Sequence, residues 1–179
     1  MNFHPFPIQT SKRLFLRNIK ASDAETIFFL RSDKTVNQFI KRPKHRQTKS
    51  IEDAFSFIEK QHKNIENNVS IVWGITLKND PQLIGTICLW NFSENRDVAE
   101  VGYDLNPEFH NKGIMSEALN MIIDFGFKEL KLHKIEAFTD CKNESSKRLL
   151  TKNGFHLNAS RKDTDNASNL IFEIDNNLI

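Results

Sequence analysis

The sequence predicts a mixed α/β fold, in which one twisted, mostly antiparallel sheet of about seven strands is flanked by about four helices. Three observations support this prediction. Short β-rich runs recur along the chain, and two of them flank Lys78-Asn79-Asp80-Pro81, a turn signal that joins antiparallel neighbours. Amphipathic stretches with apolar residues at helical spacing lie between other runs. One such stretch separates two late strands, as a crossover helix does.

The N-terminal half is expected to hold one strand and two helices. At 12–17 polar and apolar side chains alternate, which is typical of a half-buried strand. Ser22 or Asp23 is placed to cap a first helix, whose apolar stripe follows directly. A second helix is predicted from Ser50 to about Asn67. Five apolar residues form its expected inner face: Ile51, Ala54, Phe55, Ile58 and Ile65.

The C-terminal half is expected to combine strands with two further helices. The strands are predicted at 70–77, 83–91, 98–105, 134–139, 155–159 and 170–174. The helices are predicted at 115–130 and 143–152, and Gly154 follows the second one where a left-handed cap is expected. Because no linker, repeat or low-complexity segment interrupts this order, residues 1–179 are expected to form a single domain.

Composition and charge argue against several classes of function. The chain has 25 Lys and Arg against 23 Asp and Glu, a balance too even to indicate nucleic-acid binding. No apolar run approaches the roughly 18–20 residues of a membrane span, and the polar N-terminus lacks a signal peptide, so a cytoplasmic protein is expected. Cys88 and Cys141 are expected to be reduced and mostly buried. The six histidines show no ligand spacing, so no metal is expected.

The most informative segment is 100–119, where a short strand leads through a loop into an amphipathic helix. Pro107 ends the strand, and Gly113 lies in a polar loop directly before the helix. The first amides of a helix are unpaired and carry partial positive charge, so such a loop forms an anion cradle. The loop His110-Asn111-Lys112-Gly113-Ile114-Met115 is placed to bind a pyrophosphate, which predicts a phosphate-bearing cofactor. A dinucleotide or nucleoside-triphosphate enzyme is less favoured, because the chain lacks the glycine-rich turn and the Walker-type loop of those classes.

Among the carboxylates, Glu100 has the strongest bearing on the predicted chemistry. Strand alternation divides 98–105 into two faces, with Glu100, Gly102 and Asp104 on one and Val101, Tyr103 and Leu105 on the other. A glutamate in a central strand needs a reason, because an unpaired buried charge is costly. Glu100 is interpreted either as a general base with a pKa raised by burial or as a structural glutamate paired with a nearby Arg or Lys.

Three segments together resemble the GNAT acetyltransferase superfamily, and within it the Rim-type (ribosomal-protein-alanine) N-acetyltransferases. They are 99–105 (AEVGYDL), 111–119 (NKGIMSEAL), and the stretch from Asn-Glu-Ser-Ser at 143–146 to Lys-Asn-Gly-Phe at 152–155. The resemblance covers almost the whole chain. The superfamily's acetyl-CoA loop reads Gln/Arg-x-x-Gly-x-Gly/Ala. Gly113 matches its fourth position, whereas His110 and Met115 depart from the first and sixth, which matters little because the loop binds through backbone amides.

The resemblance implies acetyl-CoA as the co-substrate, and a sheet splayed between the fourth and fifth predicted strands. The exposed backbone at the end of the 98–105 strand would pair there with the pantetheine arm. The residues implied in acetyl-CoA binding are Tyr103, Leu105, His110, Asn111, Lys112, Gly113, Ile114, Met115, Ser116 and Asn143. The alternatives are an exposed lysine for Lys112, an ordinary first-turn residue for Ser116 and a helix cap for Asn143.

The resemblance further implies direct acetyl transfer to a primary amine, with Glu100 as general base and Ser146 as the acid that protonates the departing CoA thiolate. The favoured acceptor is the α-amino group of a protein N-terminus, as in ribosomal proteins, because its pKa of ~7.7–8 lies far below the ~10.4 of lysine. The alternatives are a small amine (an amino acid or a polyamine) and a non-catalytic acetyl-CoA sensor. The sequence leaves the acceptor open, and a monomer or a homodimer fits equally.

A basic loop, Lys41-Arg42-Pro43-Lys44-His45-Arg46 and onward to Lys49, follows the first predicted helix. In the implied architecture it lies near the acceptor site. It either steers an acidic partner, such as a ribosomal surface or an acidic substrate, or is a solvated loop.

Overall fold

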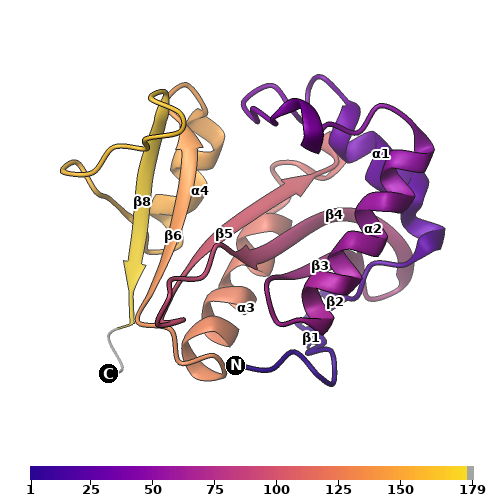
Figure 1. Cartoon of the computed structure of the whole chain (residues 1–179), viewed down its shortest axis with the longest axis horizontal. Helices are drawn as coiled ribbons and strands as arrows, with labels where there is room; N and C mark the ends of the chain where they lie inside the picture. Colours follow the sequence, from indigo (N-terminus) through magenta and orange to yellow (C-terminus); the bar gives the residue numbers. More distant parts are fainter. Residues whose placement is uncertain (177–179) are drawn as a thin grey trace.

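The computed structural model describes residues 1–176, which contain an eight-stranded sheet in the order β1-β2-β3-β4-β5-β6-β8-β7 (Figure 1). The strands are β1 (Gln9–Thr10), β2 (Leu14–Arg17), β3 (Ile71–Leu77), β4 (Asp80–Trp90), β5 (Val98–Leu105), β6 (Lys134–Asp140), β7 (His156–Leu157) and β8 (Asn169–Asp175). The helices are α1 (Ala24–Ser32), α2 (Ile51–Glu66), α3 (Ile114–Lys128) and α4 (Glu144–Lys152), with short 3-10 turns η1 (Ala21–Asp23), η2 (Lys44–Arg46) and η3 (Pro107–Phe109).

This architecture confirms the predicted mixed α/β class. Every neighbouring pair of strands is antiparallel except β5 and β6, which are parallel and joined through α3. The two-residue β1 was not predicted, and it raises the strand number from about seven to eight. Within residues 1–176 no helix is both long and apolar enough to span a bilayer.

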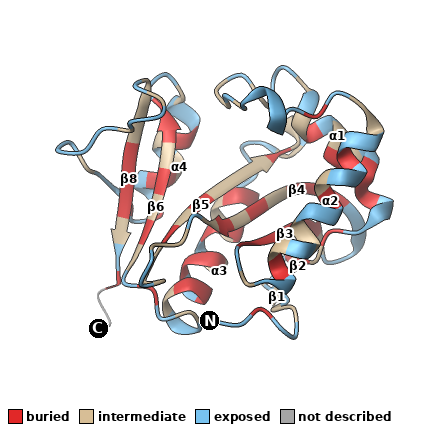
Figure 2. Ribbon diagram, in the orientation of Figure 1, coloured by how far each residue is buried: buried red, intermediate tan, exposed pale blue. Residues whose placement is uncertain are grey.

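The helices cover the two faces of the sheet in pairs. The strand register aligns Val72, Cys88 and Gly102 across β3, β4 and β5, so these residues share one face. Val72 packs in the apolar cluster of α1 and α2, which therefore lie on that face. Leu119 of α3 and Leu150 of α4 belong to the larger cluster on the opposite face. Figure 1 shows α2 in front of the sheet and α3 behind it, and Figure 2 shows the buried residues between these layers.

Two predictions about burial were wrong. Phe55, expected on the inner face of α2, is 44% exposed. At 100° per residue it lies about 60° around the helix from Ile58, at the margin of the buried stripe. Cys141, expected to be mostly buried, is exposed in the turn that follows β6. Both cysteines are free thiols, as expected.

The strands β5 and β6 diverge along their length, and this divergence positions the site. Their parallel pairing covers only Val98↔Lys134, Ala99↔Ile135 and Glu100↔Glu136 among the described residues. On its other edge β5 stays paired with β4 as far as Leu105. The two strands separate visibly beyond this point (Figure 1). The sheet is therefore split between the fourth and fifth predicted strands, in agreement with the expected splay.

A buried ion pair fixes the entry to α1. Asp23 occupies the position before α1, but its carboxylate does not cap that helix. It instead accepts hydrogen bonds from the Lys20 amide at 2.7 Å and from both terminal nitrogens of Arg17, at 2.7 and 2.9 Å. Both side chains are nearly buried, at 11% and 7% exposure. The pair links the end of β2 to the first helix.

Replacing Asp23 by Ala is expected to lower the free energy of unfolding by about 3–5 kcal/mol, because the Arg17 guanidinium would stay buried without its counter-charge. The matched control is Asp124→Ala, which removes an exposed (i, i+4) pair with Lys128 and should cost only about 0.3–0.5 kcal/mol. Urea denaturation measures both changes. Equal losses in the two variants would contradict a stabilising role for the buried pair.

Candidate active site

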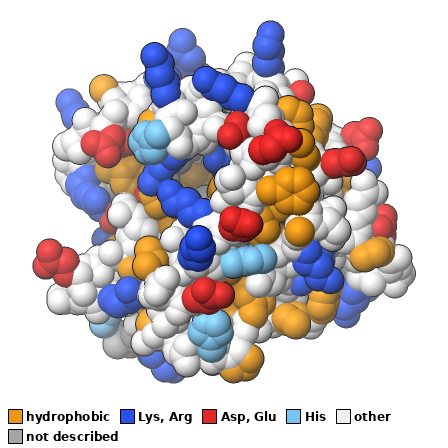
Figure 3. Space-filling view, turned by 45° about the vertical axis from the view of Figure 1, so that its right-hand side comes forward, with side chains coloured by type: hydrophobic (Ala, Val, Ile, Leu, Met, Phe, Trp, Pro, Cys, Tyr) orange, Lys and Arg blue, Asp and Glu red, His pale blue; other side chains and the backbone are white. Residues whose placement is uncertain are grey.

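A groove of about 1700 Å3 opens where β5 and β6 diverge. Its walls come from β5, the end of β6, the N-terminal ends of α3 and α4, and the loops at 39–48 and 161–166. Every residue predicted for the site lines this groove except Lys112. Figure 3 shows Lys and Arg side chains gathered around a hollow, in keeping with the basic residues of the lining. The structure thus brings together residues that the sequence spreads from 100 to 146.

The loop before α3 presents backbone amides to the groove. Gly113 precedes the helix with φ of 73°, in the left-handed region that favours glycine. The first bond of the helix runs from the Glu117 amide to the Gly113 carbonyl at 3.1 Å. The amides of Ile114, Met115 and Ser116 therefore lie in the first turn, where a helix offers no acceptor of its own. This geometry suits an anion.

An ion pair that the sequence reasoning missed braces this loop. Arg13, from the turn before β2, donates to the Lys112 carbonyl at 2.9 Å and to the Glu117 carboxylate at 2.7 Å. The Ser11 hydroxyl donates to the same carboxylate at 2.5 Å. The contacts join residues about a hundred positions apart, so no local pattern could have revealed them. They fix the start of α3 against the N-terminal strands.

Several loop side chains are engaged internally instead of pointing freely into the groove. The His110 ring donates from Nε2 to the Leu105 carbonyl at 3.0 Å, and its backbone amide donates to Pro107. The Ser116 hydroxyl donates to Asn153 Oδ1 at 2.7 Å, which ties α3 to the end of α4. Lys112 lies outside the groove lining, with Nζ 5.4 Å from the centre of a phenylalanine ring.

Ile114 and Met115 direct their side chains into the apolar core, where they are 5% and 8% exposed. Met115 therefore does not crowd the loop, although it stands where the superfamily pattern has Gly or Ala. Asn111 has φ of 59°, which turns the backbone sharply before Gly113. The loop is thus shaped by its backbone and anchored by its apolar side chains.

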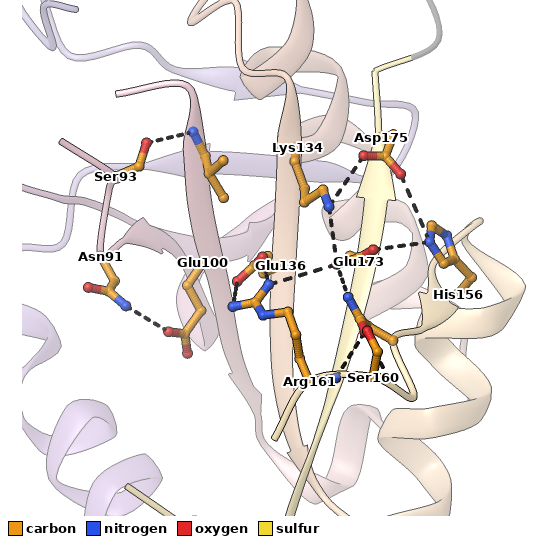
Figure 4. Close-up of polar contacts among 12 residues, drawn as sticks. Asn91, Ser93, Glu100, Lys134, Glu136, His156, Ser160, Arg161, Glu173 and Asp175 are labelled. Atoms are coloured by element: carbon orange, nitrogen blue, oxygen red, sulfur yellow. Dashed lines mark hydrogen bonds and ion pairs between the residues drawn. The ribbon is translucent and has the colours of Figure 1, made fainter. Parts of the chain in front are cut away.

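Glu100 lies at the point where the two strands part. Burial raises the pKa of Glu100 to about 7. The Asn91 side-chain amide, which donates to the carboxylate from 3.5 Å, lowers the pKa by a smaller amount. The carboxylates of Asp163 and Glu136 add smaller increases. Glu136 stands opposite Glu100 in β6 and is itself paired with Arg161 (Figure 4). Glu100 has no such cationic partner among the described residues, so the alternative of a structural ion pair is not supported.

A pair of hydroxyl groups lies on the other face of β5. The Tyr103 hydroxyl is 2.8 Å from Ser146 Oγ, although 43 residues separate them in sequence. Burial raises the pKa of Tyr103 to about 12, so the phenol stays protonated near neutral pH. Asn143 caps α4 by accepting the Ser146 amide at 3.1 Å. The capping interpretation of Asn143 is therefore present in the structure, and Tyr103 joins Ser146 as a possible proton donor.

A family model described as "Acetyltransferase (GNAT) domain" matches residues 13–156. The chain belongs to the GNAT acetyltransferase family. The "Uncharacterized N-acetyltransferase YoaA" of Bacillus subtilis is 36% identical over 150 residues, covering 84% of this chain and 83% of that protein. This GNAT chain is therefore an N-acetyltransferase, and acetyl-CoA is the donor that the family uses.

Solved structures extend the likeness. The ribosomal-protein-S5-alanine acetyltransferase of Vibrio fischeri is 26% identical, with a TM-score of 0.80, and the match covers 96% of this chain and 97% of that one. RimL, a ribosomal L7/L12 α-N-protein acetyltransferase solved with coenzyme A, shares the fold at 16% identity, with a TM-score of 0.80 over 94% of this chain and 98% of that chain. These neighbours confirm the resemblance of this GNAT acetyltransferase to the Rim-type enzymes.

Proposed function

We propose that this acetyltransferase acetylates the α-amino group at the N-terminus of a polypeptide, as a ribosomal-protein acetyltransferase does. The observation that carries the proposal is the end of β5–β6 pairing at Glu100↔Glu136. The gap beyond that point connects the two faces of the sheet. The amide-lined loop of α3 lies on one face, and Glu100 projects to the other. A donor held on the first face can therefore meet an acceptor that enters from the second.

The donor would be held by backbone groups. The amides of the first turn of α3 would bind the pyrophosphate of acetyl-CoA, as helix N-termini bind anions. The Asn106 amide donates to Ile84 of β4 at 2.8 Å. Because strand residues alternate in direction, the backbone groups of Tyr103 and the amide of Leu105 face the gap instead, while the Leu105 carbonyl accepts from the His110 ring. Those groups would pair with the pantetheine arm, and an amide there would polarise the thioester carbonyl.

Glu100 would remove the proton from the acceptor amine through a water molecule. With its pKa at about 7, the carboxylate is mostly ionised at pH 8, so the base is available under ordinary conditions. An α-amino group has a pKa of ~7.7–8, within about one unit of Glu100, whereas a lysine at ~10.4 stays protonated. The similar pKa values of Glu100 and an α-amino group favour an α-amino acceptor. The amine then attacks the thioester carbon directly.

The departing sulfur would meet the hydroxyl pair of Tyr103 and Ser146. A thiolate has a pKa of ~8.5, so a complete proton transfer from a phenol near 12 would be uphill by about 3.5 units, or ~5 kcal/mol. The pair therefore stabilises the sulfur by hydrogen bonding as charge develops, with Ser146 or Tyr103 as the contacting group. No step requires a metal.

A thiol-release assay with acetyl-CoA tests this proposal against the alternatives. We expect release with peptides that carry a free α-amino group and none with the same peptides blocked at that group. Release only with free amino acids or polyamines would favour a small-amine acetyltransferase. Binding of acetyl-CoA without release by any amine would identify a sensor, and calorimetry would detect that binding.

The loop itself can be tested at Gly113. An added Cβ would have space, since its nearest neighbour is Arg13 Nη2 at 3.5 Å, but the positive φ makes any side chain strained. Gly113→Ala is expected to weaken acetyl-CoA binding about tenfold, because a strain of roughly 1–2 kcal/mol would be relieved by moving the amides. The matched control is Gly154→Ala, which carries the same kind of strain at φ of 89° outside the groove. Calorimetry should show an unchanged acetyl-CoA affinity in the control, and equal losses would contradict the loop's role.

A further inference from the structure

Three arginines form a cluster in the part of the groove that Glu100 faces. Arg31 comes from α1, and Arg42 and Arg46 come from the loop that follows α1. Arg31 is fixed in place. Its guanidinium donates to Thr48 Oγ1 at 2.8 Å and to the Arg46 carbonyl at 2.8 Å, and it lies 3.9 Å above the Phe57 ring. All three arginines line the groove. Within the basic loop, Arg42 is partly buried and Thr48 is buried, whereas Arg46 is exposed at the rim of the groove.

Asp104 is the one carboxylate within ion-pair distance of this arginine cluster in residues 1–176. Its closest contact with Arg42 is 3.9 Å, and both side chains are largely buried, at 10% and 15% exposure. Asp104 already accepts two hydrogen bonds from Thr86, at 3.0 and 2.8 Å. Arg42 also donates to the Asn37 side-chain oxygen. Arg31 makes no ion pair with Asp104 among the described residues, so the cluster has one nearby carboxylate, which is already engaged.

Burial and the neighbouring positive charges shift the pKa values of the arginines in the cluster. Burial lowers the pKa of Arg31 to about 10, and the neighbouring Arg42 and Arg46 lower it further, against a smaller opposing effect of Asp104. Burial also lowers the pKa of Arg42. An added anion would relieve this repulsion, and its attraction would be strong because water is partly excluded. A polyamine would instead add positive charge to a positive site.

The cluster is also within reach of the reacting amine. Asp104 follows Glu100 by four residues on the same strand face, about 13 Å along the strand. An extended peptide advances ~3.3–3.6 Å per residue, so a side chain in its first three residues can reach the cluster while its amino group stays near Glu100.

We propose that the acceptor polypeptide carries a carboxylate side chain within its first three residues, and that Arg42 and Arg46 bind this group in the groove. This inference rests on the proposed α-amino acetylation and specifies its substrate class as an acidic N-terminus. Arg31 acts as a positioning residue, because its hydrogen bond holds the Arg46 backbone.

The test compares two peptides of equal length that differ only by Glu or Gln at the third position, the one of the first three whose side chain reaches farthest along the strand. We expect kcat/KM to be about tenfold higher for the Glu peptide, the lower end of the effect of a charged hydrogen bond. Arg42→Gln and Arg46→Gln should each reduce this ratio severalfold, mainly through KM of the Glu peptide. Lys78→Gln, which removes an exposed charge outside the groove lining, should preserve the ratio. The preference should also weaken as salt is added.

The outcomes separate this inference from the function on which it rests. If neither peptide releases thiol, the proposed α-amino acetylation fails. If both are acetylated with equal kcat/KM, or if the ratio survives in both arginine variants, the acidic acceptor is wrong while the function stands. A free acidic amino acid that outperforms the Glu peptide would also overturn it. Melting temperatures within a few degrees of the parent chain would show that the variants are folded.

Discussion

Replacing Glu100 by Gln is expected to lower kcat by roughly 10²–10⁴-fold, the usual contribution of a general base. The amide keeps the size of the side chain and its hydrogen bond with Asn91, but it cannot accept the proton of the amine. Affinity for acetyl-CoA should stay unchanged, because the loop that would bind it lies on the other face of the sheet. A steady-state thiol-release assay with a saturating peptide measures the loss, and calorimetry measures the affinity.

The pH dependence gives an independent test of Glu100. Because the carboxylate is active only when ionised, kcat should rise with pH through the pKa of about 7 and level off above it. This rising limb should disappear in Glu100→Gln. Glu94→Gln is a matched control, since Glu94 is exposed in the turn before β5 and outside the groove. A limb that persists near pH 7 in Glu100→Gln would assign the titration to another group.

The same pKa fixes the sign of the stability effect. Burial raises the pKa of Glu100 from 4.5 to about 7, so the folded state binds the proton more tightly and the fold loses stability as pH rises from about 4.5 through about 7. Glu100→Gln removes that charge. The variant should therefore melt at the same temperature as the parent chain or higher at pH 8, and a lower melting temperature would indicate a structural glutamate. Loss of activity without loss of stability is the pattern expected of a functional residue.

Local signals predicted the centre of this molecule well. Polar alternation, Pro107 and Gly113 gave the limits of β5 and the loop before α3, because each acts on its immediate neighbours. The face of Glu100 followed from the two-residue period of a strand. Phe55 shows where such reasoning becomes weak, because the burial of a residue at the margin of a helical stripe depends on which element packs beside it.

Long-range contacts were beyond the sequence. The Arg13–Glu117 brace joins residues 104 positions apart, and the Tyr103–Ser146 hydrogen bond joins residues 43 apart. No sequence pattern around one residue of each pair predicts its contact with the other. The arginines around Asp104 were predicted only in part, as a basic loop that the family resemblance placed near the acceptor site, whereas Arg31 lies in α1 and was not predicted. These contacts depend on which strands and helices the fold brings together. They fix the positions of the predicted site residues relative to one another.

Removing one hydroxyl of the Tyr103–Ser146 pair is expected to give the second large loss of kcat. Tyr103→Phe is expected to lower kcat about 10–100-fold, because the developing thiolate would lose a hydrogen bond to a charged group. The phenylalanine ring keeps the packing of tyrosine on that face of β5. The rising limb near pH 7 should remain, since Glu100 is untouched. An unchanged kcat would show that the sulfur leaves without help from Tyr103.

A double-mutant cycle decides whether the two hydroxyls act as one unit. At 2.8 Å, each hydroxyl orients the other, so removing either one disturbs the same donor. We therefore expect Ser146→Ala to lower kcat, and the variant that combines it with Tyr103→Phe to be no slower than the slower single variant. Losses that multiply would instead mean that Tyr103 and Ser146 contribute separately. In that case the two hydroxyls would contact different parts of the donor, and the larger of the two single losses would identify the group that hydrogen-bonds to the sulfur.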